Sequence, residues 1–162
     1  MQDQHAPQHT WLDQLIGSWS FESECQMGPG QPPMKTAGTE IVRSLGGLWT
    51  IGEGTLGTCQ EGETPGKSIM TLGFDPRTGR FLGTFIASMM THLWVYDGSL
   101  DASGKVLTLD TIGPSFASDG QLAKYQDIIE FVDEGHRILR SNLQLPDGSW
   151  TQFMEAHYRK AA

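Results

Sequence analysis

The chain has little of what membrane spans, disulfide scaffolds and nucleic-acid surfaces require. It has no run of about 18 apolar residues, and its start, "MQDQHAPQHTW", shows no secretory signal. The two cysteines, Cys25 and Cys59, are too few for a disulfide framework. Lys and Arg number 11 against 19 Asp and Glu, which gives a formal charge of −8. That charge repels nucleic acid and anionic membranes. We therefore expect a cytoplasmic protein with no nucleic-acid or membrane partner.

What is present suits a single globular domain. The 162 residues are 38% hydrophobic and include five Trp and seven Phe. This is enough for one core or one internal cavity. We predict a flexible arm over residues 1–7 and one domain over residues 8–162.

A short helix is predicted near the N-terminus. Helical spacing in "HTWLDQLIGSW" connects four apolar residues, Trp11, Leu12, Leu15 and Ile16. Thr10 is the predicted N-cap and Gly17 the predicted end.

The rest of the chain reads as strands separated by turns. "DPRTGR" at 75–80 has a Pro after Asp and a Gly suited to positive φ, and "DASGK", "SDGQ", "DEGH" and "PDGS" repeat this chemistry. Runs rich in Val, Ile, Thr and aromatic residues lie between them. The pattern predicts an antiparallel meander of about eight to ten strands. Closure into an up-and-down β-barrel removes exposed edges and is favoured over a sandwich. The Pro- and Gly-rich segment 27–38 is either a lid over the barrel mouth or a connector.

A glycine motif, "GEGTLG" at residues 52–57, matches the dinucleotide-binding pattern. That chemistry needs a helix to open directly after the loop, whereas "TCQEGETPG" follows here. We interpret Gly52 and Gly54 instead as strand residues on one face, leaving room for a close neighbour.

The five histidines give no metal-binding pattern. His5 and His9 are assigned to the N-terminal arm, His92, His136 and His157 form no close pair in sequence, and neither cysteine has a partner at metal spacing. Glu155 and His157 share one face of the last predicted strand. Such a pair could serve acid–base chemistry or simply form a solvated strand face.

The stretch "SMMTHLWVYDG" holds the principal candidate, His92. Alternation along a strand places His92, Trp94 and Tyr96 on one face. In the preceding strand, Phe81, Phe85 and Met89 share one face and Leu82, Ile86 and Met90 the other. Both faces are apolar, so parity does not say which one lies inside.

The segment "LIGSWSF" resembles the G-x-W signature of lipocalins and other calycin barrels. In that group the Trp closes one barrel end and stacks on an Arg of the last strand. The resemblance assigns these structural roles to Gly17, Trp19 and Arg159.

Nearly the whole chain is similar to one calycin-like family, domain of unknown function 1579. The matching pieces are "HTWLDQLIGSW", "RSLGGLW", "MTLGFDPRTGRFLGTF", "LWVYDGSLDASGKVLTL" and "FMEAHYR". Relatives read Trp-x-Asp where this chain has Phe85-Ile86-Ala87, and Tyr-Arg where it has Tyr125-Gln126. Chemistry that relies on that Asp or Arg is therefore absent here. The resemblance implies a barrel with an interior cavity, and it does not imply an activity.

The first hypothesis is a barrel that binds a small, largely apolar molecule inside. The predicted lining is Trp49, Phe85, Met89, His92, Trp94 and Tyr96, with Glu53 and Tyr125 as polar anchors. A buried Glu53 would have to be protonated or paired.

Two other classes of function stay open. One is an enzyme that uses His92 or the Glu155–His157 pair as general base, or a haem-binding barrel with His92 or His157 as axial ligand. The other is a barrel filled by its own side chains that acts as an interaction module. A homodimer is compatible with each of them, and the sequence assigns no cofactor and no metal.

Overall fold

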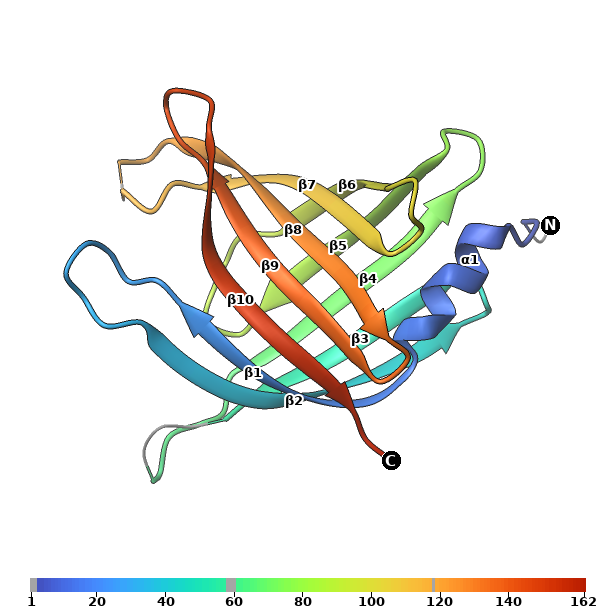
Figure 1. Ribbon diagram of the computed structural model, residues 1–162, viewed down its shortest axis with the longest axis horizontal. Helices are drawn as coiled ribbons and strands as arrows, with labels where there is room; N and C mark the ends of the chain where they lie inside the picture. Colours follow the sequence, from blue (N-terminus) through green and yellow to red (C-terminus); the bar gives the residue numbers. More distant parts are fainter. Residues whose placement is uncertain (1–2, 58–60, 118) are drawn as a thin grey trace.

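The computed structural model describes residues 3–57, 61–117 and 119–162, and in them the chain forms a closed antiparallel barrel of ten strands with one short helix (Figure 1). Every strand pairs with its neighbour in sequence, and β1 pairs with β10 to close the ring. The helical elements are α1 (Pro7–Leu12) and a 3-10 turn (Asp13–Leu15). The strands are β1 (Gly17–Cys25), β2 (Met34–Leu45), β3 (Trp49–Leu56), β4 (Lys67–Asp75), β5 (Arg80–Ala87), β6 (Trp94–Leu100), β7 (Val106–Pro114), β8 (Leu122–Asp133), β9 (His136–Gln144) and β10 (Trp150–Lys160). The predicted all-β up-and-down barrel is confirmed.

The helix begins at Pro7, so the prediction of Thr10 as N-cap was wrong. Pro suits the first helical position, where a backbone N–H would have no partner in the helix. His9 stabilises this start because its Nδ1 accepts the backbone N–H of Ala6 at 2.8 Å. Its Nε2 lies 3.1 Å from the carbonyl of Phe74 and must donate, since Nδ1 is already an acceptor. His9 is thus a buried residue that joins α1 to β4.

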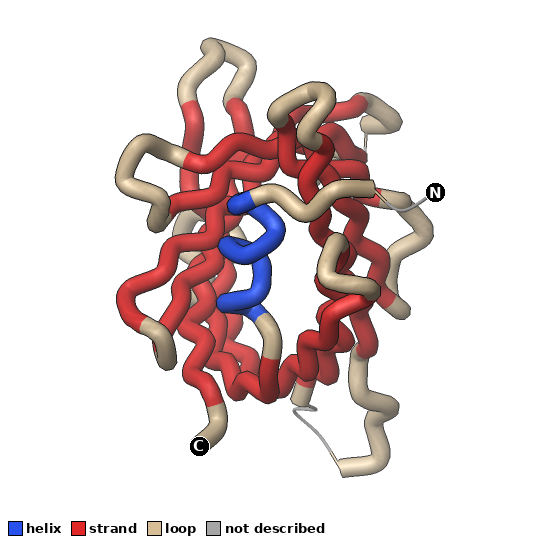
Figure 2. The backbone as a smooth tube through the Cα atoms, turned by 90° about the vertical axis from the view of Figure 1, so that its right-hand side faces the viewer, coloured by secondary structure: helices blue, strands red, loops and turns tan. Residues whose placement is uncertain are grey.

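The helix lies across one end of the barrel (Figure 2). Trp11 donates its indole N–H to the carbonyl of Gly104 at 2.6 Å. The same ring packs edge-on against Phe81 and Phe131, with centroids 5.8 and 5.5 Å away. We call this end, with the strand halves next to it, the closed half, and we call the opposite part the open half.

Burial alternates along the strands, and the inward residues are packed differently in the two halves. In the closed half they are almost inaccessible: Trp19, Leu72, Phe81, Leu107, Leu109 and Ile129. In the open half the inward residues keep accessible surface: Ser23, Thr36, Leu56, Met70, Phe85, Trp94 and Met154. The core therefore sits under the helix, and the other half is less tightly filled.

The structure bears on two segments that the sequence analysis singled out. The segment 27–38 is only partly a loop, because β2 already begins at Met34. The "GEGTLG" residues that the structure describes belong mostly to β3, with Gly52 facing inward. A Cβ at Gly52 would lie 2.9 Å from the carboxylate of Glu40, so this glycine makes room for a buried acid. Cys59 lies outside the described residues. None of the helices in the described part is long and apolar enough to cross a membrane.

Candidate functional site

The wall of the barrel opens where β6 and β7 part. Their ladder pairs only residues 97–100 with 107–110. Yet β6 stays paired with β5 as far as Trp94, and β7 stays paired with β8 as far as Pro114. Residues 94–96 and 111–114 therefore face each other without backbone pairing. We call this gap the seam, and it lies in the open half.

His92 bridges the seam with its side chain. Its Nε2 lies 2.9 Å from the backbone carbonyl of Ile112. Because a carbonyl only accepts, Nε2 carries the proton and donates. The imidazole also packs edge-on against Trp94, with ring centroids 4.7 Å apart. A side-chain hydrogen bond thus takes the place of a missing backbone bond between two strands.

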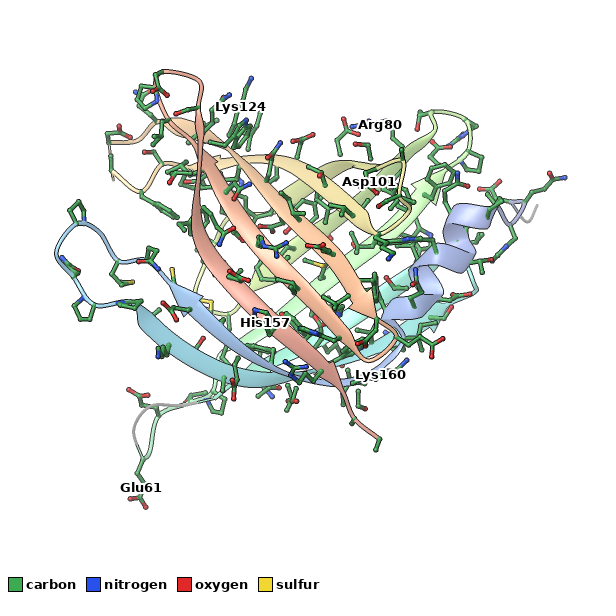
Figure 3. All side chains as sticks on the ribbon, viewed as in Figure 1. Glu61, Arg80, Asp101, Lys124, His157 and Lys160 are labelled. Atoms are coloured by element: carbon green, nitrogen blue, oxygen red, sulfur yellow. The ribbon has the colours of Figure 1, made fainter. Side chains whose placement is uncertain are left out.

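A hollow of about 670 Å³ lies at the seam, and we call it the seam hollow. Two buried residues, Thr111 and Tyr125, and the half-buried His92 form its inner side. Apolar side chains and a polar rim complete the lining: Leu93, Val95, Ile112 and Trp150, with Asp97, Asp110, Lys124 and Gln144. Lys124 stands out from the barrel surface in Figure 3. The hollow is therefore apolar in its body and charged only at its edge.

Aromatic rings connect the seam to the barrel interior. Trp94 meets Tyr125 edge-on, at 5.2 Å between centroids and an angle of 90°. The Tyr125 hydroxyl donates to the carbonyl of Pro114 at 2.6 Å, and burial raises the pKa of this phenol. Phe116 and Phe153 extend the contact, each packing against Tyr125. Gln126 donates from Nε2 to Asp110 at 3.0 Å on the outer face.

Two polar atoms beside the hollow lack a partner among the described residues. They are the indole nitrogen Nε1 of Trp94 and the hydroxyl Oγ1 of Thr111, both buried. Trp94 also depends on Gly113, because a Cβ there would lie 2.1 Å from its ring. The position of the indole therefore requires a glycine on the facing strand.

The sequence analysis missed a half-buried, inward-facing acid, Asp127, between the two halves. Tyr96 donates to its Oδ2 at 2.5 Å and Ser141 to its Oδ1 at 2.6 Å. Burial raises the pKa of Asp127 because desolvation outweighs these two hydrogen bonds. The pKa of Tyr96 is also raised, by burial and then by the neighbouring carboxylate. Asp127 shares inward parity with Tyr125, and that signal could have found it.

The nearer cation over Trp19 is Arg137 of β9, and Nζ of Lys160 of β10 lies 5.6 Å from the ring centroid, so the assignment of Arg159 was wrong. The Arg137 guanidinium carbon lies 4.6 Å from the Trp19 ring centroid and 3.9 Å from that of Tyr158. Arg137 points inward and forms an ion pair with Glu40, whereas Arg159 points outward and is exposed. The Nε of Arg137 has no partner in the described part of the chain. Arg137 borders a space of about 20 Å³, which is enough for one water molecule.

Three predicted lining residues lie elsewhere. Trp49 and Glu53 alternate with the inward residues of β3 and therefore point outward, so neither lines the interior. Trp49 packs on Gly73, where a Cβ would be 2.6 Å from its ring. Met89 follows the end of β5 and is 56% exposed. Phe85 does face inward. Trp94 and Tyr96 on β6 and Tyr125 on β8 also point inward, and His92 lies two residues before β6, at the seam.

The Glu155–His157 pair lies on the outer wall, where Figure 3 shows His157 on the surface of β10. Glu155 accepts from Nε2 of His157 at 3.1 Å, and Nδ1 of His157 lies 2.9 Å from Nε2 of His136. An open hollow of about 750 Å³ adjoins this pair. Because both nitrogens of His157 are engaged, it has none left to take a substrate proton or to bind haem inside the barrel.

His157 therefore does not have the geometry of the predicted general base. Among the described residues His92 has no carboxylate partner, and its Nε2 donates to the Ile112 carbonyl, which leaves Nδ1 as the unprotonated nitrogen. In the same part of the chain no group of three or more His, Cys, Asp or Glu side chains is placed to hold a metal ion.

The closed ten-stranded ring, the N-terminal helix and the Trp19 stack define a calycin-like barrel. Comparison with known families makes this specific. The chain belongs to the family described as "Protein of unknown function (DUF1579)", which matches residues 4–160. No curated protein matches the sequence.

Two solved structures share the fold. Rv2717c from M. tuberculosis aligns over 98% of this chain and 100% of its own, with 14% identity and a TM-score of 0.64. The S-type phycobiliprotein lyase CPES from Guillardia theta aligns over 98% and 94%, with 11% identity and a TM-score of 0.61. At these identities the likeness concerns the fold alone.

Proposed function

We propose that this protein binds a small, largely apolar molecule in the seam hollow. The observation that supports this is a space of about 670 Å³ that reaches buried aromatic residues through an unpaired part of the wall. Binding sites for small molecules commonly measure about 300–1,000 Å³ and have apolar walls with few polar groups.

The charges at the rim favour a ligand without net charge. Asp97 is paired with Arg80 at 2.8 Å, and Asp110 accepts from Gln126 at 3.0 Å. These carboxylates therefore already have partners. Val95, Ile112 and Leu93 line the hollow and are each more than half exposed, which is the surface an apolar ligand would cover.

Titration with the neutral apolar dye N-phenyl-1-naphthylamine tests the proposal. We expect dye fluorescence to rise on binding to the native protein, and Val95→Arg to weaken binding at least about tenfold, because it places a charge among apolar walls. The matched control is Ile86→Arg, an outward position on β5 that is 45% exposed and does not line the hollow. Equal weakening by both variants, or no binding by the native protein, would contradict the proposal.

The compartment is part of the same proposal. Cys25 carries a free thiol, and this supports a reducing, cytoplasmic environment for the binding protein. Alkylation of intact cells with a membrane-permeant maleimide, followed by mass analysis, would label this thiol directly, whereas a chain recovered as an intermolecular disulfide would contradict this compartment.

A further inference from the structure

The two unpartnered polar groups beside the seam hollow point to the chemistry of its ligand. Resting on the proposed function, we infer that the ligand is an apolar molecule with a carbonyl-type oxygen, which accepts hydrogen bonds from the indole N–H of Trp94 and the hydroxyl of Thr111. This inference goes beyond binding as such, because it specifies which group an apolar ligand must have.

The register of the strands brings the two groups together. Asp97 pairs with Asp110, and continuing this register places Trp94 opposite Gly113. Thr111 precedes Gly113 by two residues and shares its inward face. Trp94 and Thr111 therefore lie on the same inward face, and the Trp94 ring reaches across the seam to Gly113, where a Cβ would lie 2.1 Å from it.

Thr111 is part of the lining of the hollow, and Trp94 contacts two residues that line it. Thr111 lines it directly and is only 7% exposed. The Trp94 ring packs against both His92 and Tyr125, which line the hollow as well. The absence of a side chain at Gly113 leaves the indole room to lie across the seam.

The donor and acceptor inventory selects the chemical class. An indole N–H can only donate, whereas a hydroxyl can donate or accept. One oxygen with two lone pairs satisfies both groups, but a cationic or donor-only ligand leaves the indole unsatisfied. Because a buried donor without a partner costs free energy, an acceptor arriving there binds more tightly than an apolar group of the same shape.

The neighbouring polar side chains do not compete for this role. The Tyr125 hydroxyl donates to Pro114, and Nε2 of His92 is held by Ile112. Trp94 and Thr111 are therefore the two groups that donate hydrogen bonds to the ligand oxygen.

Two probes of nearly the same shape test the inference on the native protein. 2-Acetylnaphthalene carries a ketone oxygen, and 2-ethylnaphthalene has a methylene in its place. We expect the ketone to displace N-phenyl-1-naphthylamine at about fivefold to tenfold lower concentration, the size of one or two net hydrogen bonds. Trp94→Phe and Thr111→Val should each reduce this preference to about threefold or less. Thr108→Val is the matched control, because Thr108 lies on the outward face of the same strand and should leave the preference unchanged.

Nuclear magnetic resonance gives a readout independent of affinity. The indole N–H resonance of Trp94, assigned by its loss in Trp94→Phe, should move downfield with the ketone and not with the hydrocarbon. If both probes bind the native protein equally, or if the preference survives both substitutions, the inference is overturned while the proposed function stands. If neither probe nor dye binds, the proposed function itself fails.

Discussion

The closed and open halves of this barrel are made of the same ten strands but are filled differently. Under α1, Trp19 and Phe81 are each 2% exposed and Leu107 is fully buried. In the other half the inward Phe85, Trp94 and Met154 keep accessible surface. Alternating strands therefore decide which side chains point inward, and the helix decides which of them are sealed from solvent.

The polar groups of the two halves also differ, because the Arg137 charge of the closed half has a partner and two polar groups of the open half have none among the described residues. In the closed half the Arg137 charge is paired with Glu40 and lies between the rings of Trp19 and Tyr158. In the open half, Trp94 Nε1 and Thr111 Oγ1 are left without partners among the described residues. A paired and stacked charge suits a structural core, whereas unpartnered polar groups suit the ligand contact that we infer for the open half.

Removing one tryptophan from each half should give the largest contrast. We expect Trp19→Ala to lower the free energy of unfolding by about 3–5 kcal/mol, because it opens a cavity in a sealed core and removes the surface on which Arg137 stacks. Trp94→Ala should cost about half of that or less, since its side chain is only half-buried. Urea unfolding of both variants measures the difference, and equal losses would show that the two halves are equally packed.

Asp127 lies between the halves, and its substitution should cost somewhat less. Asp127→Ala leaves the hydroxyls of Tyr96 and Ser141 without an acceptor, for an expected loss of about 2–4 kcal/mol. Asp127→Asn keeps one acceptor oxygen and should be milder.

The pH dependence of Asp127→Asn sharpens this prediction. Because burial raises the carboxyl pKa in the folded state, the folded protein takes up this proton more readily than the unfolded chain. The stability of the native protein relative to the variant should therefore rise as the pH falls through the folded pKa and level off below about 3.9, the unfolded value. Unfolding measured at a series of pH values checks the sign. A relative stability that falls over the same range would mean that the carboxylate is stabilised as an anion.

Gly113→Ala tests the fit across the seam. The new Cβ would meet the Trp94 ring at 2.1 Å, so the indole must move, at an expected cost of about 1–3 kcal/mol. In a Trp94→Ala background the same substitution should cost little, so the two effects should not add. Unfolding of the single and double variants checks this, and simple additivity would mean that Trp94 does not depend on the glycine.

The smallest effect is expected on the outer wall, away from both halves of the interior. The pKa of His136 lies below its ordinary value because of desolvation first and then the positive charge of Arg159. Arg159→Gln should therefore raise this pKa. Titration of the His136 imidazole Cε1–H resonance in the native protein and the variant measures the change.

The sign of the stability effect follows from the same shift. A lowered folded-state pKa means that the unfolded chain binds this proton more readily, so the His136 contribution favours folding above about pH 6.5 and is lost as the pH falls below it. If the His136 pKa were unchanged in Arg159→Gln, the charge of Arg159 would not be a cause of the lowered His136 pKa.

Local patterns predicted the barrel well because they depend on neighbours in sequence. The turn "DPRTGR" appears as the link between β4 and β5, with Gly79 at φ 70°. The start of the helix was missed because His9 is held by Phe74, which lies 65 positions further along the chain. The stack on Trp19 was assigned to the wrong arginine because β9 lies beside β10 in the ring, and a residue of β9 can place its cation over the indole equally well.

The faces of the strands were harder to assign than their positions. On β3 the inward face is formed by Thr50, Gly52 and Gly54, whereas Trp49 and Glu53 lie on the outward face. Hydrophobicity alone favoured the face with Trp49 as the inner one, which was wrong. His136 and His157 are 21 residues apart, and only the pairing of β9 with β10 brings their nitrogens to 2.9 Å. Parity fixes which residues share a face, but closure of the ring decides which face lies inside.

The sequence by itself determined an antiparallel series of about eight to ten alternating strands, the turns between them and one short helix, because each depends on spacing and turn chemistry over a few residues. The tertiary structure alone decided where the wall stays unpaired, which half the helix seals, and which groups meet across the ring. Those features arise from contacts between strands distant in sequence, such as Trp94 over Gly113 and Arg137 on Trp19, and packing is decided only when the ring closes.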